Sequence, residues 1–142
     1  MVTLDSISIK GETGFIKIVF DEGYWFPEIK NFSDWYDVKT LIEVKSSDFH
    51  VNSTFWTCMA ELRDFFQQIT ECNTTLQGTA ILNAHESDIE ITVTYGSRGQ
   101  VNIKGKVSDW NNELKFEFLS DQSYIKNSID EHQLIDKKYS RM

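Results

Sequence analysis

The clearest pattern along the chain is a helical spacing of apolar residues in one central segment, with shorter alternating patterns on either side. Between residues 55 and 69 the large apolar side chains recur at steps of four, three, four and three positions. They are Phe55, Met59, Leu62, Phe66 and Ile69. This spacing puts all of them on one face of a helix, which we expect to pack against a sheet.

Both ends of this predicted helix carry local signals. Asn52, Ser53 and Thr54 come just before it, and side chains of these types cap the first turn of a helix by accepting hydrogen bonds from its free amides. Gly78 follows the apolar stripe, and we expect the helix to end before it, near Asn73.

The segments before the helix have the alternation of strands. Strands are predicted over residues 3–9, 14–21 and 36–45, with a short fourth strand at residues 49–51. The loop over residues 22–34 is rich in aromatics, and Pro27 argues against a central strand there. Tyr24, Trp25 and Phe26 stand together in this loop, which either caps the core or forms an exposed recognition surface.

The pattern of strands returns after Gly78. Strands are predicted over residues 79–82, 88–95, 101–107 and 114–118. Gly96 to Gly99 reads as a hairpin turn because alternating residues flank it on both sides. The last three of these strands therefore form an antiparallel meander with one face toward solvent.

A second helix is expected at the end of the chain. Ser120 or Asp121 is placed to cap it, and Ile125, Ile129 and Leu134 give it an apolar face. A cap side chain of this kind contributes about 0.5–2 kcal/mol to stability, so we interpret this junction first as a structural feature.

These elements predict a single domain, residues 1–142, of the α+β class. We expect an antiparallel sheet or flattened sandwich of about seven or eight strands, with one central amphipathic helix and one C-terminal helix. The predicted core comprises Phe55, Met59, Leu62, Phe66, Ile69, Ile91, Val93, Val101, Ile103, Phe116 and Phe118.

The net charge and the cysteines restrict the partners and the cellular compartment that we expect for this chain. A net charge of −8 disfavours nucleic acid and anionic membranes as partners, and it favours a basic protein partner or simply solubility. Cys58 and Cys72 would lie about 21 Å apart along a helix, too far for a disulfide, which suits a reducing cytosol. The sequence shows no secretory signal and no apolar run long enough to span a bilayer, so we expect a cytoplasmic protein.

The sequence contains no recognisable catalytic or metal-binding motif. His50, His85 and His132 are far apart and have no cysteine or acidic residue at a metal-ligand spacing. Nucleophile-elbow, phosphate-loop and dinucleotide-loop patterns are absent as well. We therefore expect no cofactor, no metal and no enzymatic activity.

The second half has an order of features that resembles the WapI-type bacterial immunity proteins and related small bacterial proteins. The matching features are LRDFF on the helix, GTAIL after it, the glycine-bounded strand from Gly99 to Gly105, and SDQSYI from Ser120 to Ile125. The resemblance implies an inhibitor encoded beside a contact-dependent toxin, which binds the toxin domain in the producing cell. Many such toxins attack RNA or DNA and are basic, which is compatible with the acidic charge of this chain.

We predict that partner binding uses acidic residues of the second half together with the aromatic loop. The acidic residues are Glu86, Asp88, Glu90, Asp109 and Glu113, and the aromatic anchor is Tyr24, Trp25 and Phe26. No lysine or arginine falls between Asn83 and Gly96 to neutralise the first three acids. The alternative is a small-molecule-binding or enzymatic β-domain with a pocket beneath residues 24–32, and a third interpretation is a general interaction module.

Overall fold

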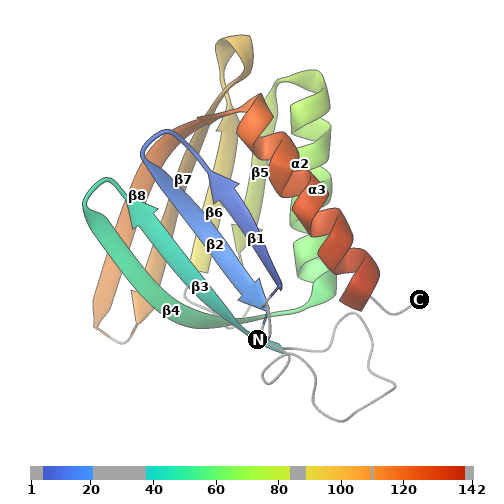
Figure 1. Cartoon of the computed structure of the whole chain (residues 1–142). Coiled ribbons are helices and arrows are strands. Elements are labelled where there is room, and N and C mark those ends of the chain that lie inside the picture. Colours follow the sequence, from blue (N-terminus) through green and yellow to red (C-terminus); the bar gives the residue numbers. More distant parts are fainter. Residues whose placement is uncertain (1–4, 21–37, 84–88, 110, 140–142) are drawn as a thin grey trace.

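The computed structural model describes residues 5–20, 38–83, 89–109 and 111–139. Within these ranges one order of elements, four strands followed by a helix, occurs twice (Figure 1). The first half consists of β1 (Asp5–Lys10), β2 (Gly14–Phe20), β3 (Val38–Ser46), β4 (Phe49–Thr57) and α2 (Met59–Thr75). The second half consists of β5 (Gly78–Asn83), β6 (Ile89–Tyr95), a short 3-10 turn η1 (Ser97–Gly99), β7 (Gln100–Asp109), β8 (Asn112–Asp121) and α3 (Gln122–Tyr139).

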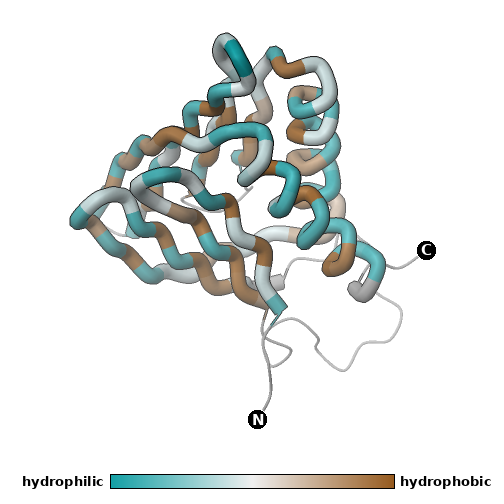
Figure 2. The backbone as a smooth tube through the Cα atoms, turned by 45° about the horizontal axis from the view of Figure 1, so that its top comes forward, coloured by the Kyte–Doolittle hydropathy of each residue, from teal (hydrophilic) through white to brown (hydrophobic). Residues whose placement is uncertain are grey.

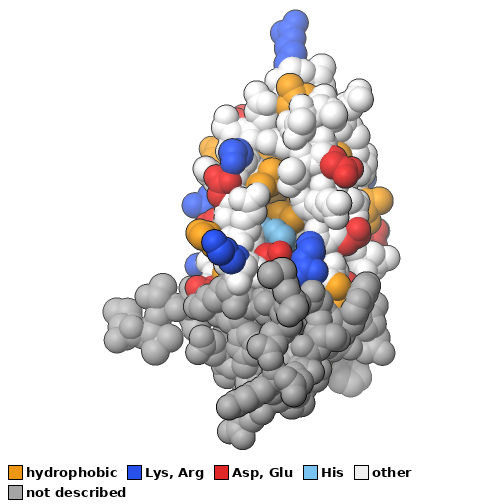
Figure 3. All heavy atoms as spheres, turned by 90° about the vertical axis from the view of Figure 1, so that its right-hand side faces the viewer, with side chains coloured by type: hydrophobic (Ala, Val, Ile, Leu, Met, Phe, Trp, Pro, Cys, Tyr) orange, Lys and Arg blue, Asp and Glu red, His pale blue; other side chains and the backbone are white. Residues whose placement is uncertain are grey.

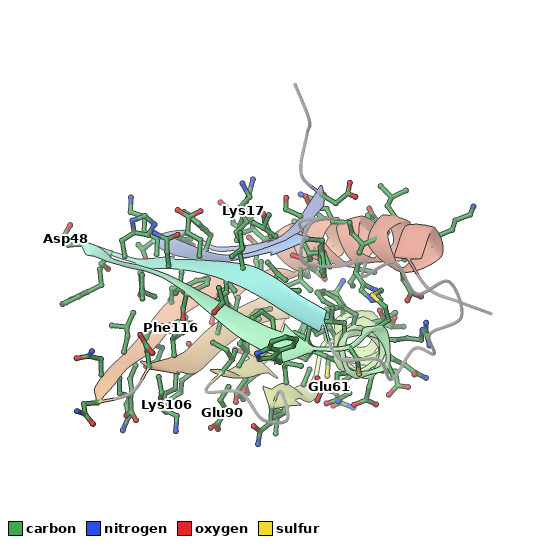
Figure 4. The ribbon with its side chains drawn as sticks, turned by 90° about the horizontal axis from the view of Figure 1, so that it is seen from below. Lys17, Asp48, Glu61, Glu90, Lys106 and Phe116 are labelled. Atoms are coloured by element: carbon green, nitrogen blue, oxygen red, sulfur yellow. The ribbon has the colours of Figure 1, made fainter. Side chains whose placement is uncertain are left out.

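Each set of four strands forms its own antiparallel meander. The strand orders are β1-β2-β3-β4 and β5-β6-β7-β8, so every strand pairs with its neighbours in sequence. Figure 4 shows the two sheets as two layers with both helices at one side. The described residues thus form an α+β fold with two four-stranded sheets, one central helix and one C-terminal helix, which confirms the predicted fold class.

Each helix follows one sheet and packs against the first strand of the other. Helix α2 contacts β5, α3 contacts β1, and the two helices also contact each other (Figure 1). Each half thus contributes its helix to the other half, and this arrangement joins the two halves. Apolar side chains from both halves therefore meet in one buried cluster within the described residues.

Side chains of the two helices also close the edges of these first strands. On α2, Gln68 Oε1 accepts a hydrogen bond from the backbone N–H of Ile81 in β5 at 3.0 Å. On α3, Glu131 Oε1 accepts one from the backbone N–H of Ser8 in β1 at 2.8 Å, and Ser128 Oγ donates to the Ser8 carbonyl at 2.6 Å. An edge strand whose backbone groups are hydrogen-bonded in this way has fewer free N–H and C=O groups to pair with another chain.

The core is a single apolar cluster with contributions from both sheets and both helices. Hydrophobic and hydrophilic positions alternate along the strands in Figure 2, as expected when only one face of each sheet is buried. Every residue predicted for the core is buried, and Leu62 and Ile69 have no exposed surface. Gly105 lies opposite Phe116, where a β-carbon would collide with the aromatic ring and with the carbonyl oxygen of Glu90.

The predicted start of the central helix is wrong by four residues. Residues Asn52 to Thr54, expected to cap the helix, lie inside β4, and Phe55 is also a strand residue. Phe55 pairs with Thr40 in the β3–β4 ladder, and Cys58 is still extended just before the helix begins. Continued ladder bonding to β3 outweighs the local capping preference of this short polar run. The helix ends two residues beyond the predicted Asn73, at Thr75.

The C-terminal helix begins as predicted. Oδ1 of Asp121 accepts hydrogen bonds from the backbone amides of Ser123 at 2.8 Å and Tyr124 at 3.0 Å, so Asp121 caps the helix. Ile125 and Ile129 are buried. Leu134, expected on the same face, is 71% exposed, and the buried position of the next turn is Ile135.

Replacing Asp121 with alanine should lower the free energy of unfolding by about 0.5–2 kcal/mol, because two first-turn amides lose their acceptor. Urea unfolding of the purified protein measures this change. Asp121→Asn is the matched control, since an asparagine oxygen can accept the same bonds, and it should stay close to the wild type. An alanine variant as stable as the wild type would show that these bonds contribute nothing.

Candidate partner-binding surface

Three of the predicted acidic residues lie at one end of the second sheet. Glu90 stands near the start of β6, Asp109 ends β7, and Glu113 lies near the start of β8. The register places Glu90 opposite Lys106 and Glu113 opposite Ser108, at the end of the sheet where β7 turns into β8. Residues far apart in sequence are thus brought to one edge of the molecule.

The other predicted contact residues fall outside the described part of the chain. Glu86 and Asp88 lie between Asn83 and Ile89, and Asn83 pairs with Glu90 at the same end of the sheet. Tyr24, Trp25 and Phe26 belong to the undescribed segment 21–37. The aromatic anchor and the pocket beneath residues 24–32 therefore remain predictions.

Lysines from neighbouring positions partly neutralise this end of the sheet. Lys106 Nζ lies 4.0 Å from Glu90 Oε2, and Lys115 Nζ lies 3.7 Å from Glu113 Oε1. Figure 4 shows Glu90 and Lys106 together on the outward side of the sheet. Sequence reasoning missed the first pair because it counted lysines only along β6. The hairpin turn around Arg98 could have indicated this pair. When β6 and β7 are paired about that turn, Lys106 lies opposite Glu90.

The outer face of the second sheet is hollowed and polar. The described residues that line the hollow are Glu90, Thr92, Thr94, Asn102, Lys104, Gly105, Lys106, Lys115, Phe116 and Glu117. Asn102 Nδ2 donates to Glu117 Oε2 at 2.7 Å, while Asn102 Oδ1 is buried without a partner. The lining offers side-chain hydroxyls, amides, amines and carboxylates, which suit polar contact with a partner.

A second cluster of titratable groups joins the two helices. Arg63 of α2 binds Asp136 of α3 through Nη2–Oδ1 at 3.0 Å and Nε–Oδ2 at 3.3 Å. His132 lies beside this pair and stacks on Phe66, with ring centroids 4.5 Å apart. Burial lowers the pKa of His132 to about 4, although the carboxylate of Asp136 raises it, and Arg63 lowers it further. The imidazole is therefore neutral near pH 7 and contributes to packing.

The two cysteines are buried and are not joined by a disulfide, as expected from their separation. Burial, and to a smaller degree the neighbouring charge of Glu71, raises the pKa of Cys72, so its thiol stays protonated near neutral pH. Among the described residues, no group of three or more histidine, cysteine or acidic side chains is placed to hold a metal ion.

The helical face carries charges of both signs. Figure 3 shows acidic and basic side chains interspersed with apolar ones over the described part of this face, rather than a patch of one sign. None of the helices in the described ranges is long and apolar enough to cross a membrane. Within the described residues, the end of the second sheet is the place where the predicted acids gather.

Comparison with protein-family models gives a match along most of the chain. Residues 6–140 match the Immunity protein WapI-like family, which covers both sheets and both helices and confirms the resemblance seen in the sequence. No curated protein and no solved structure matches the chain.

Proposed function

Because the chain belongs to the WapI-like immunity protein family, we propose that it binds and neutralises a cognate bacterial toxin domain in the cytoplasm of the producing cell. The family match over residues 6–140 is the observation that carries this proposal. A family of immunity proteins implies a protein partner and an inhibitory role rather than catalysis. The hollow on the second sheet, which is lined mainly by polar side chains, is compatible with binding a protein.

The toxin is proposed to be a basic nuclease domain. A domain that binds nucleic acid has to present positive charge to phosphates, and the net charge of −8 on this chain complements it. Complementary charge accelerates encounter more than it tightens the final complex. The charge therefore supports fast capture of the toxin.

The proposed contact surface is the acidic end of the second sheet together with the aromatic loop. Glu90, Asp109 and Glu113 lie at this end, and the chain that links β5 to β6 adds Glu86 and Asp88. Tyr24, Trp25 and Phe26 are proposed as the desolvated anchor that charge alone does not provide.

Association with the toxin should slow as salt rises. The partner is first captured from the native host with this chain as bait and identified by mass spectrometry. The screening length falls from about 10 Å at 0.1 M salt to about 4 Å at 0.5 M, so we expect the on-rate to drop about tenfold over this range. Stopped-flow measurement of the on-rate with the purified partner checks this.

The combined variant Glu86→Gln, Asp88→Asn, Glu90→Gln should associate about three- to tenfold more slowly at 0.1 M salt. A matched control neutralises three exposed acids elsewhere, with Glu12→Gln, Glu71→Gln and Asp130→Asn, and changes net charge equally. The control should slow association less. Equal, salt-independent on-rates in all three proteins would reject this surface.

A further inference from the structure

Three of the four sheet edges are covered by other parts of the chain. Helices α3 and α2 cover β1 and β5 through the side-chain hydrogen bonds described above. The edge of β8 is also bonded, because the backbone N–H of Glu12 donates to the Leu119 carbonyl at 2.9 Å and Ser46 Oγ donates to the Glu117 carbonyl at 3.1 Å. The fourth edge is the outer side of β4, and no strand of the described residues pairs with it.

The backbone groups on this outer side can be identified from the register. Ser46 and Phe49 flank a two-residue turn and therefore exchange hydrogen bonds with each other. Because bonded pairs alternate along the ladder, the N–H and C=O groups of His50, Asn52 and Thr54 point away from β3. By the same alternation in β8, the carbonyls of Glu117 and Leu119 point away from β7. There they accept the hydrogen bonds from Ser46 Oγ and the Glu12 amide.

The composition of β4 lacks the features that usually protect an exposed edge. Its sequence, FHVNSTFWT, contains no lysine, arginine, acidic residue, proline or glycine over nine positions. Natural edge strands are commonly short or carry lysine, proline or a bulge, which prevents pairing with other chains. Phe49, at the start of β4, is 66% exposed and offers an apolar contact beside this edge.

Acidic groups stand at both ends of this neutral strand. Asp48 precedes β4 directly, and the carboxylate of Glu61 follows it, where Oε1 accepts a hydrogen bond from Thr57 Oγ1 at 2.9 Å. Figure 4 shows Asp48 at one end of β4 and Glu61 near the other. A strand of nine residues spans about 27 Å, which sets the separation of the two acidic ends.

We propose that the outer edge of β4 is a docking site for an extended segment of the basic toxin, which adds an extra strand to the first sheet. Main-chain bonds to His50, Asn52 and Thr54 would hold the segment, and basic side chains near its ends would meet Asp48 and Glu61. This inference rests on the proposed function. A second copy of the chain fits the edge less well, because two chains of net charge −8 repel each other.

Amide hydrogen exchange, followed by NMR on the purified chain with and without the toxin domain captured above, tests the proposal directly. The amides of His50, Asn52 and Thr54 should exchange at least tenfold more slowly in the complex. A complex that forms without this protection overturns the docking site and leaves the proposed function intact. A chain that does not bind the toxin overturns both.

Proline substitution gives an independent readout. Asn52→Pro and Thr54→Pro each remove an outward donor while sparing the bonds to β3, and we expect toxin affinity to fall at least 100-fold. Asn52→Thr and Thr54→Val are matched controls that keep the amide, and they should bind within about threefold of the wild type. Proline variants that fold and bind like the wild type contradict the proposal. A different result would be protection of the amides of His50, Asn52 and Thr54 without toxin, in a chain that has the mass of a dimer in solution. That result would show that a second copy of the chain binds the β4 edge, and it would also overturn the proposal.

Discussion

Replacing Leu62 with alanine is expected to lower the free energy of unfolding by about 2–5 kcal/mol. Leu62 has no exposed surface and lies on the buried face of α2, in the cluster that joins the helices to both sheets. The substitution removes apolar contacts and leaves a cavity that the surrounding side chains fill only in part. A domain of this size is stabilised by about 5–15 kcal/mol, so the change takes a large share of the total.

Denaturant unfolding at pH 7 measures this effect. Gln67→Ala is the matched control on the same helix, because Gln67 is exposed and alanine favours helix, and its effect should stay within about 0.5 kcal/mol. Leu62→Met, which keeps the volume, should cost less than about 1.5 kcal/mol. If Leu62→Ala costs no more than Gln67→Ala, α2 does not hold the two halves together as described.

Acid should destabilise the protein through His132. Burial lowers the pKa of this imidazole from 6.5 to about 4 in the folded state, while the unfolded chain binds its proton near the ordinary value. The stabilisation is therefore complete above about pH 6.5 and is lost as the pH falls toward 4. Between pH 7 and pH 5 this residue alone should lower the free energy of unfolding by about 2 kcal/mol.

Denaturant unfolding at several pH values between 5 and 7, compared with His132→Gln, isolates this contribution. Glutamine does not titrate, so the variant should lose the pH dependence that His132 supplies, whatever its stability at pH 7. His50→Gln is the control, because His50 is exposed on β4 and bonds only Glu43 in the described structure. A His132→Gln protein with the same slope against pH as the wild type would show that the imidazole is not buried as a neutral group.

Local patterning predicted most of the fold because alternation along the strands matches burial in both sheets. In β6, for example, Ile91 and Val93 occupy the apolar positions of the alternating pattern, and both are buried in the structure. The start of α2 was misassigned because Phe55 satisfies both a helical step to Met59 and a place in the β4 ladder. Only the pairing of β4 with β3, a tertiary contact, decides between these two conformations.

The candidate site was less predictable than the fold. Acidic residues could be found in sequence, but the lysine beside Glu90 comes from the neighbouring strand and depends on the register of β6 and β7. The covered edges of the sheets depend on contacts between residues far apart in sequence, such as the hydrogen bond from the Ser8 amide to Glu131. Sequence patterns show which residues are exposed, whereas tertiary structure decides which exposed groups remain free for a partner.

We propose that this chain neutralises a toxin by direct binding. The most direct measurement is the growth of cells that express the captured toxin domain, with this chain either co-expressed or absent. We predict that the toxin alone arrests growth and that co-expression of the chain restores it to the rate of cells without toxin. Growth arrest that persists despite soluble expression of the chain would show that the chain does not neutralise this toxin.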